Sequence, residues 1–475
     1  MNKFERSRRQ FLRTASLASM AGISASPFIL GLNSMAAMAQ STATSDYRAL
    51  VCVFLQGGND GHGTVIATDP TSFSAFTAAR SGAPGLAYPQ SVLLPITLKT
   101  PQTGRTFAFN PALNGVQNLF NAGRAAIVAN TGTLIEPVSK AQVAANSAPL
   151  PASLFSHFDQ TAAWQAIASN GGSAEHVGWG GAVADVIESL NMNSNATFTC
   201  ISTAGIALFL SGETSFQLNV TSAGPIPIGG LSNSLYGLPA ASNPLSSILS
   251  ADETNLFAKE YEVVVQRSIK AQATLASAML PAGAGGIPNP TQYLDPQTNK
   301  LTDNPLATSL QTVARIIGGR SSLGVTRQIF YVQLGSFDTH TNQAIQHAQL
   351  LTQLSQALEY FDGVMTANGL GNQVTTFTAS DFGRTLTSNS NGTDHGWGSH
   401  HFIVGGAVQG QDMYGQYPVI GTDQANDVGA GRLIPTTSVD QYAATLARWF
   451  GLTDSQIRQV FPNFANFGSY LGFLG

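Results

Sequence analysis

The sequence predicts a large α/β fold with a mostly parallel central sheet flanked by helices. Residues 48–56 and 125–132 are apolar almost throughout, and such runs are typical of strands that are buried on both faces. A helical pattern at 110–123 precedes the second strand, as in the units from which parallel sheets are built. Several strands also end in an aspartate, and the carboxyl edge of a parallel sheet is where ligands bind.

The first 39 residues are typical of a twin-arginine export signal and are excluded from the fold. Residues 7–13 (SRRQFLR) precede an apolar stretch that reaches about Leu32, and residues 37–39 (AMA) match a cleavage site. We therefore expect the twin-arginine translocase as an export partner and a mature chain, residues 40–475, that folds as one domain in the periplasm or outside the cell. The apolar stretch is too short and too weak for a stable membrane anchor.

The charge balance argues against a nucleic-acid partner. The signal holds 5 of the 22 Lys and Arg residues and 1 of the 26 acidic residues, so the mature chain keeps 17 and 25, a formal net charge of −8. Nucleic-acid binding needs the opposite balance, because the protein must neutralise phosphates.

The only cysteines, Cys52 and Cys200, lie in strand-like segments. An oxidising compartment permits a disulfide between them, and two separately buried thiols are the other interpretation.

The remaining elements follow one another along the chain without an internal repeat. Helices are predicted at 154–168 and 178–190, and a strand at 196–203. The segment 204–250, much of it rich in Gly, Ser, Pro and Asn, is predicted to leave the main fold as a small loop or β cap. The later elements are a helix at 251–280, a loop at 281–307, a helix ending at 318, a strand at 328–334, a helix at 342–368 and a strand at 373–379.

Polar residues gather where three predicted strands end. Asp60 follows the first strand, Asp338 and His340 follow the strand at 328–334, and Asp381 follows the last strand. The next stretch, residues 392–406 (GTDHGWGSHHFIVGG), holds three of the eight histidines. Because the carboxyl ends of parallel strands meet at one edge of a sheet, we expect these side chains to converge there.

Carboxylates and imidazoles at one edge indicate a site for a divalent metal ion, with Zn, Mn, Ca and Mg all compatible. Such an ion polarises an ester oxygen or lowers the pKa of a bound water or hydroxyl. No HExxH, CxxC or P-loop pattern supports the site independently. The candidate ligands are Asp60, Asp338, His340, Asp381, Asp394 and His395.

Each polar residue also has a structural interpretation. The alternatives are a turn at Asp60, a helix cap at Ser156, a cap at Asp338 for the helix that follows, an ion pair between Asp381 and Arg384, and alternating core and solvent positions for His400 and His401. Taken together, the repeated placement at strand ends favours a site, because coincidence would have to act several times.

Six motifs together resemble one family of exported bacterial proteins. They are the twin-arginine leader and, in order, LVCVFLQGGNDG, SLFSHFDQTAAWQ, LGSFDTH, TASDFGRT and GTDHGWGSHHFIVGGAVQG. From about residue 48 to the C-terminus the chain is similar to the domain-of-unknown-function family 1501, which resembles a distant branch of the alkaline phosphatase and sulfatase superfamily. The resemblance implies an alkaline-phosphatase-like α/β fold with one or two metal ions at the carboxyl edge of its sheet.

The resemblance also implies metal ligands. Asp60 matches the carboxylate after the first strand, Asp338 with His340 matches a carboxylate and imidazole pair, Asp381 matches the second metal carboxylate, and His395 matches the late histidine. Asp338 and His340 are two residues apart rather than the superfamily's four, which puts one metal position in doubt.

The catalytic residues implied by the resemblance lie near a predicted helix start. Ser156 matches the nucleophile, Arg384 is expected to clamp the oxygens of an anionic group, and His157 or His395 is expected to protonate the leaving oxygen. Phe382 departs from the pattern, because the superfamily commonly has a histidine directly after its second metal aspartate.

These observations predict an exported metal-dependent hydrolase of phosphate or sulfate esters, with a small-molecule or glycan ester as substrate. The alternative is a catalytically degenerate exported protein that binds a glycan or a protein partner. Phe382 and the scarcity of Lys and Arg favour the alternative.

Overall fold

The computed structural model describes residues 46–166, 176–227, 231, 244–249 and 255–474, and the chain from Asp46 onward forms one compact unit. The predicted export signal, residues 1–39, lies outside the described residues, as do parts of the predicted cap at 204–250. Among the described helices, none combines the length and the apolar character needed to cross a membrane.

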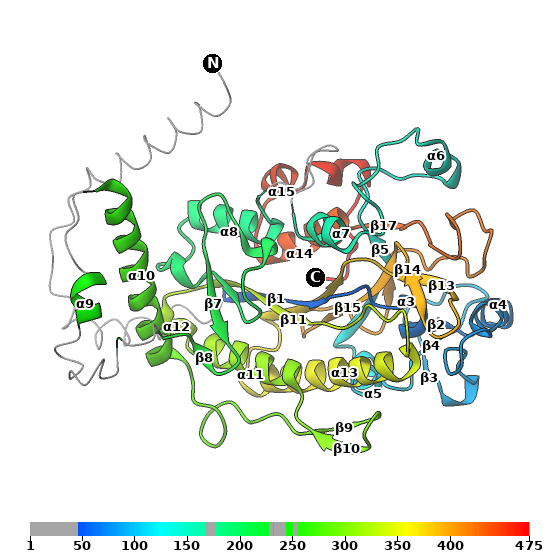
Figure 1. Ribbon diagram of the computed structural model, residues 1–475, viewed down its shortest axis with the longest axis horizontal. Coiled ribbons are helices and arrows are strands. Elements are labelled where there is room, and N and C mark those ends of the chain that lie inside the picture. The colour runs from blue at the N-terminus through cyan, green and yellow to red at the C-terminus, as the bar shows by residue number, and fades with distance from the viewer. Residues whose placement is uncertain (1–45, 167–175, 228–230, 232–243, 250–254, 475) are drawn as a thin grey trace. The chain divides into compact units, whose positions relative to one another are not determined.

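A ten-stranded sheet lies at the centre of the unit (Figure 1). Its order is β16-β5-β15-β12-β1-β11-β6-β7-β8, and β17 pairs with β5. The strands are β1 (Arg48–Leu55), β5 (Ala125–Gly132), β6 (Cys200–Ser202), β7 (Gln217–Thr221), β8 (Gly224–Pro225), β11 (Arg327–Leu334), β12 (Val374–Ser380), β15 (Ser399–Val404), β16 (Met413–Tyr414) and β17 (Thr437–Ser438).

Most neighbouring strands are parallel, which confirms the predicted fold class. Strands β12, β1, β11, β6 and β7 run in one direction. The exception inside the sheet is β15, which is antiparallel to both β12 and β5. The second half of the histidine-rich stretch, from Ser399 to Val404, therefore runs back through the sheet in the opposite direction.

Both faces of β1 are buried, which explains its continuous apolar sequence. Val51 and Val53 belong to one hydrophobic core, whereas Cys52 and Phe54 belong to the other, because successive side chains of a strand point to opposite faces. Each buried aliphatic side chain contributes roughly 1.5–3 kcal/mol. A strand of this composition is therefore stable only at the centre of a three-layer fold.

Helices cover the two faces of the sheet (Figure 1). Helices α5 (Asn114–Asn121), α11 (Pro305–Gly318) and α13 (Gln343–Ala367) contribute to one core. Helices α7 (His157–Gln165), α8 (Trp179–Ser189), α14 (Val439–Phe450) and α15 (Asp454–Val460) contribute to the other.

Shorter elements complete the described part of the chain. Strands β2, β3 and β4 form a small antiparallel sheet, and the pairs β9–β10 and β13–β14 are antiparallel. These elements are α3 (Gly61–Thr64), β2 (Val65–Ala67), α4 (Pro70–Arg80), η1 (Gln90–Val92), β3 (Leu94–Ile96), β4 (Phe107–Phe109), α6 (Lys140–Ala145), η2 (Ala196–Phe198), η3 (Leu208–Leu210), α9 (Pro244–Leu249), α10 (Leu256–Ala278), β9 (Tyr293–Asp295), β10 (Lys300–Thr302), α12 (Arg320–Leu323), β13 (Arg384–Ser388), β14 (Thr393–His395) and η5 (Pro462–Asn466).

Several sequence-based expectations need correction. Strand β7 belongs to the central sheet rather than to a separate cap, because it pairs in parallel with β6. The segment 281–307, predicted to be a loop, contains the β9–β10 hairpin. His400 and His401 are both buried, because both faces of β15 are covered, so neither alternates with solvent.

The two cysteines are separate buried thiols rather than a disulfide. Strand β11 lies between the two strands that carry them, since Cys52 is in register with Tyr331 and Cys200 with Ile329. Burial raises the pKa of both thiols, which keeps them protonated and unreactive.

Asp440 gives the fold a predictable pH dependence. It lies in the first turn of α14 and is only 7% exposed, and this burial raises its pKa to about 7. The folded protein therefore holds a proton that the unfolded chain loses above about pH 4. We expect stability to fall as the pH rises from about 4 to about 7, by at most about 4 kcal/mol from this group and less if the helix N-terminus favours the anion.

Urea unfolding at several pH values will measure this contribution. Asp440→Asn should flatten the pH dependence across that window, whereas Asp454→Asn, which changes an exposed aspartate in the first turn of α15, should leave it as in the native protein. Identical slopes for the native protein and Asp440→Asn would contradict the assignment.

Candidate functional site

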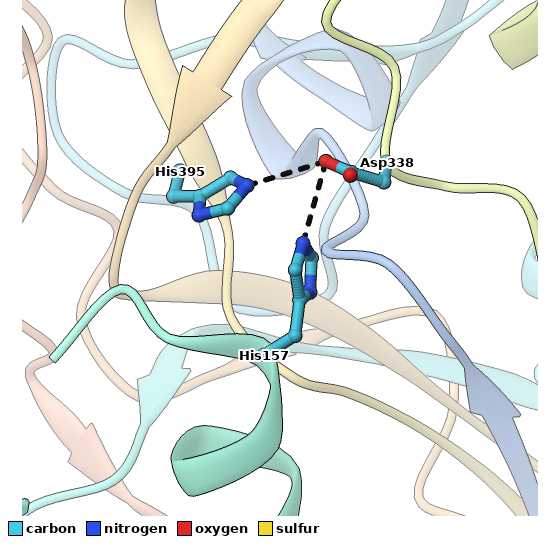
Figure 2. Close-up of side chains that lie close together, drawn as sticks. All are labelled: His157, Asp338 and His395. Atoms are coloured by element: carbon cyan, nitrogen blue, oxygen red, sulfur yellow. Dashed lines mark hydrogen bonds and ion pairs between the residues drawn. The ribbon is translucent and has the colours of Figure 1, made fainter. Parts of the chain in front are cut away.

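Three side chains from distant parts of the chain meet at the carboxyl edge of the sheet (Figure 2). Asp338 lies in the loop after β11, His395 ends β14, and His157 begins α7. Together they form a group of possible metal ligands whose donor atoms lie within 4.8 Å of one another. Of the side chains that we expected to converge at this edge, Asp338 and His395 do so, and His157 joins them.

One oxygen, Oδ1 of Asp338, is the centre of the group. It lies 3.4 Å from Nε2 of His157, 3.3 Å from Nε2 of His395 and 3.1 Å from Nε2 of His340. The Nε2 atoms of His340 and His395 are 2.8 Å apart. The site is open to solvent, because the Asp338 side chain is 45% exposed.

The opposite nitrogen of each imidazole is held by an acceptor outside the group. Nδ1 of His157 lies 2.7 Å from Oδ2 of Asp381. Nδ1 of His395 lies 2.7 Å from the carbonyl oxygen of Phe155, and Nδ1 of His340 lies 3.1 Å from Oδ1 of Asp394. A carbonyl only accepts, so Nδ1 of His395 carries the proton, and the carboxylates favour the same tautomer for the other two rings.

Oδ1 of Asp338 and the Nε2 atoms of His157 and His395 form a donor set that could hold a metal ion, and Nε2 of His340 lies beside it, 2.8 Å from Nε2 of His395. Nε2 of His157 is buried and forms no hydrogen bond. Such a set of acceptors is stable only around a cation or shared protons. In a tetrahedral zinc site the ligand atoms lie about 3.3–3.4 Å apart, which is close to the separations around Oδ1. Metal-binding histidines usually donate their other N–H to a carboxylate or carbonyl, so the residues fit a divalent metal ion.

The electrostatic environment differs between the histidines. The hydrogen bond to Asp381 raises the pKa of His157, whereas burial lowers the pKa of His395. Burial also opposes ionisation of Asp338, but its hydrogen bond with Arg384 and the charge of that guanidinium lower its pKa overall. Asp338 is therefore a carboxylate, as a metal ligand must be.

Phe382 forms an apolar support for two of the candidate ligands. Its ring centroid lies 4.7 Å from that of His157 and 4.7 Å from that of His395, and the residue is buried. The departure from the superfamily pattern at this position thus removes a ligand and instead supplies a surface on which both rings rest.

Asp60 lies outside this group, contrary to the sequence-based expectation. Its two oxygens accept hydrogen bonds of 2.7 and 2.8 Å from Arg80, and it also accepts from Gln343 and from the amide of Gly63. Asp60 is buried. Its acceptor capacity is already used, so it is an ion-pair partner rather than a metal ligand.

Asp381 and Asp394 also differ from the prediction, because each orients a histidine. Asp381 accepts from the amide of Gly57 as well as contacting His157. Asp394 contacts His340 and accepts from Asn389. Of the predicted ligands, Asp338 and His395 belong to the group of possible ligands, His340 lies beside it, and His157 is added.

Arg384 faces the protein rather than a substrate. Its side chain has 0% exposure, and it donates to Asp338 Oδ1 at 2.7 Å, to the carbonyl of Gly57 and to both oxygens of Thr393. The expected role as a clamp for a substrate anion is therefore incorrect. Arg384 positions Asp338 instead.

A buried chain of hydrogen bonds connects Asp60 to the site. Gln343 donates to Asp60 at 2.7 Å, and its carbonyl accepts from the Thr393 hydroxyl at 2.6 Å. That hydroxyl then accepts from Nε of Arg384, which in turn donates to Asp338. Sequence reasoning did not find Gln343, Thr393 or Arg80, because nothing in their local sequence distinguishes them from ordinary polar residues.

Ser156 directly precedes His157 at the start of α7. Its hydroxyl makes no capping hydrogen bond, so the capping interpretation is not realised. The preceding residue, Phe155, has a φ of 73°, a conformation that is costly for a bulky side chain. This conformation presents the Phe155 carbonyl to His395, and Arg432 stacks on the Phe155 ring.

The different surroundings of Asp60 and Asp338 predict opposite mutant phenotypes. Asp60→Asn breaks a buried ion pair, and we expect it to lower the unfolding free energy by about 3–5 kcal/mol. Asp338→Asn changes a half-exposed group and should cost less stability in the presence of a chelator while abolishing tight metal binding. Denaturant unfolding will measure the stability of both variants, and metal titration will measure their metal affinity. An Asp60→Asn variant with native stability that no longer binds metal would contradict the assignment of Asp60 to stability and Asp338 to metal binding.

Thr393 offers an isosteric test of the buried hydrogen-bond chain. Thr393→Val removes the hydroxyl that joins Gln343 to Arg384, and we expect metal affinity to fall about 10-fold or more, as when the groups that orient ligands are removed. Thr393→Ser keeps the hydroxyl and should bind metal like the native protein. Titration with Co²⁺, followed by its visible spectrum, measures affinity and ligand geometry together; equal results for the Val and Ser variants would show that the hydroxyl has no such role.

Comparison with known proteins identifies a family but no characterised relative. No curated protein matches the chain. Solved structures with partial similarity include the PsFucS1 sulfatase from Pseudoalteromonas sp., with 8% identity, a TM-score of 0.34 and coverage of 90% of this chain and 72% of that one. Ps i-CgsB has 8% identity, a TM-score of 0.33 and coverage of 89% and 76%. A family model matches residues 47–461, and the chain belongs to that family, described as protein of unknown function DUF1501.

Proposed function

We propose that this protein is an exported, metal-dependent hydrolase of phosphate or sulfate esters. The observation that carries the proposal is the convergence of three imidazole Nε2 atoms on Oδ1 of Asp338 while every Nδ1 faces an outer acceptor. Export rests on the sequence of residues 1–39, and the substrate class rests on the resemblance of the motifs to the alkaline phosphatase and sulfatase superfamily.

The residues divide into ligands and groups that orient them. His157, His340, His395 and Asp338 would hold a divalent ion, which when bound would polarise an ester oxygen and stabilise negative charge. Because their Nε2 atoms face the ion position, His157 and His395 are not available to protonate a leaving oxygen. That part of the sequence-based prediction is not retained.

Ser156 is the best-placed nucleophile. Its hydroxyl is partly exposed and caps no amide, and the residue lies at the N-terminus of α7, where backbone N–H groups and the helix dipole favour an anionic group. The next residue, His157, belongs to the metal group, and we therefore propose that the Ser156 hydroxyl attacks an ester held at this site. This is the arrangement that an activated serine requires.

Metal content and hydrolysis of aryl esters together test the proposal. We expect about one equivalent of a divalent metal in the exported protein and hydrolysis of 4-nitrophenyl sulfate or phosphate that is lost on chelation and regained with metal. His157→Ala and Asp338→Asn should lower kcat/KM by several orders of magnitude, since each factor of ten corresponds to about 1.4 kcal/mol, and Ser156→Ala should do so without loss of metal.

Two outcomes would contradict this function. A folded protein that binds no metal when Zn, Mn, Ca and Mg are supplied would remove the metal site. Stoichiometric metal without hydrolysis of any aryl ester would favour the alternative function, an exported binding protein. Asp303→Asn, an exposed change beside β10, is a control that should leave metal content and rate unchanged.

A further inference from the structure

We infer that this site prefers ester groups with a single negative charge, such as sulfate monoesters or phosphate diesters, over dianionic phosphate monoesters. The inference rests on the proposed function and names its substrate class by charge. It follows from the positions of the cationic side chains around the ligand group and from the number of carboxylates among them.

Every Lys and Arg after residue 45 lies in the described part of the chain, because the masked segments between 167 and 254 contain neither residue type. Among these cations, two hydrogen-bond to residues of the candidate site: Arg384 to Asp338, and Arg432 to the backbone of His395. Arg80 bonds to the neighbouring Asp60 and to the backbone of β13. These three guanidinium groups are the cations that hydrogen bonds tie to the site or to its neighbour Asp60.

Two of the three guanidinium groups are fully engaged by the protein. Arg384 and Arg80 are buried, and each of their nitrogens donates to a protein oxygen. Arg432 donates to the carbonyls of His395 and Gly429 and stacks on the ring of Phe155. Arg384 and Arg80 therefore have no hydrogen bond left for a substrate, and Arg432, which is half-buried, has only Nη2 left to offer. A substrate anion would meet the metal ion, the N-terminus of α7 and at most this one nitrogen.

Negative charge is abundant at the same place. Asp338, Asp381 and Asp394 all contact the histidines of the group, and Asp159 lies half-buried in the first turn of α7. One divalent ion, Arg384 and Arg432 carry four positive charges, and the three carboxylates in contact with the histidines together with Asp159 carry four negative ones, so the site has about zero net charge. A second negative charge on the substrate would therefore be repelled rather than neutralised.

The charge of the bound anion can be varied while its phosphorus centre is kept, and a sulfonate adds a monoanion with sulfur in that place. The metal-loaded protein should be titrated with phenylphosphonate above its second pKa, with methyl phenylphosphonate and with benzenesulfonate. We expect the two monoanions to bind at least about tenfold more tightly than the dianion. Hydrolysis of 4-nitrophenyl methyl phosphate and 4-nitrophenyl sulfate, set against 4-nitrophenyl phosphate, gives the matching ratios of kcat/KM.

A change of surface charge gives an independent readout. Asp159→Asn removes a carboxylate from the first turn of α7 and touches no ligand, so the affinity ratio of dianion to monoanion should rise about two- to fivefold, and the effect should weaken at high salt. Asp303→Asn makes the same chemical change beside β10 and should leave the ratio unchanged. Equal ratios in both variants would count against an electrostatic origin of the preference.

The outcomes separate this inference from the proposed function. Tighter binding and faster turnover of the dianion by a metal-dependent enzyme would overturn the charge preference and leave the hydrolase function standing. If the protein takes up no divalent metal and binds none of the three anions, both the hydrolase function and the charge preference are overturned. A preference for the monoanions that persists in a metal-loaded protein without turnover would support the charge preference while contradicting hydrolysis.

Discussion

The site depends on one constraint: a single carboxylate oxygen lies next to three imidazole nitrogens whose rings are each held at Nδ1 by an acceptor outside the group. Oδ1 of Asp338 receives a hydrogen bond from Arg384, yet His157, His340 and His395 all present Nε2 to it at 3.1–3.4 Å. The outer acceptors fix these tautomers, because a carbonyl or carboxylate at Nδ1 requires the proton on that side. The geometry that favours a cation is therefore set by the hydrogen bonds of the neighbouring loops as well as by the four inner residues.

The fold makes this constraint possible by bringing distant segments to one edge. The parallel strands β1, β11 and β12 end together, and the antiparallel β15 carries the chain back through the sheet directly after β14. Close approach at the edge needs glycine: a Cβ on Gly57, which has a φ of 113°, would lie 2.4 Å from the amide nitrogen of Asp338. The loop that carries Asp338 could not otherwise pack against the end of β1.

The sequence predicted those parts of the fold and site that depend on local pattern. Continuous apolar strands such as β1 and the order of aspartates at strand ends identify the sheet and its ligand edge. Whether an aspartate at that edge faces a metal or a guanidinium depends on residues that are distant in sequence or that lie on another helix or strand. Asp60 is bound by Arg80, which ends α4, a helix that the sequence analysis did not identify, and β7 joins the sheet through its pairing with β6. Such tertiary pairings leave no trace in spacing or composition.

The inward orientation of Arg384 connects stability, metal binding and substrate charge. A buried guanidinium without a partner is costly, and here the nearest carboxylate is the ligand Asp338, which Arg384 holds in place while the chain through Thr393 and Gln343 fixes Arg384 itself. The same hydrogen bonds that keep the arginine satisfied also keep it from the substrate. Under the proposed function, the charge of the substrate would be balanced by the ion, by the amides at the start of α7 and by the part of Arg432 that the protein leaves unoccupied, which suits a group with little negative charge.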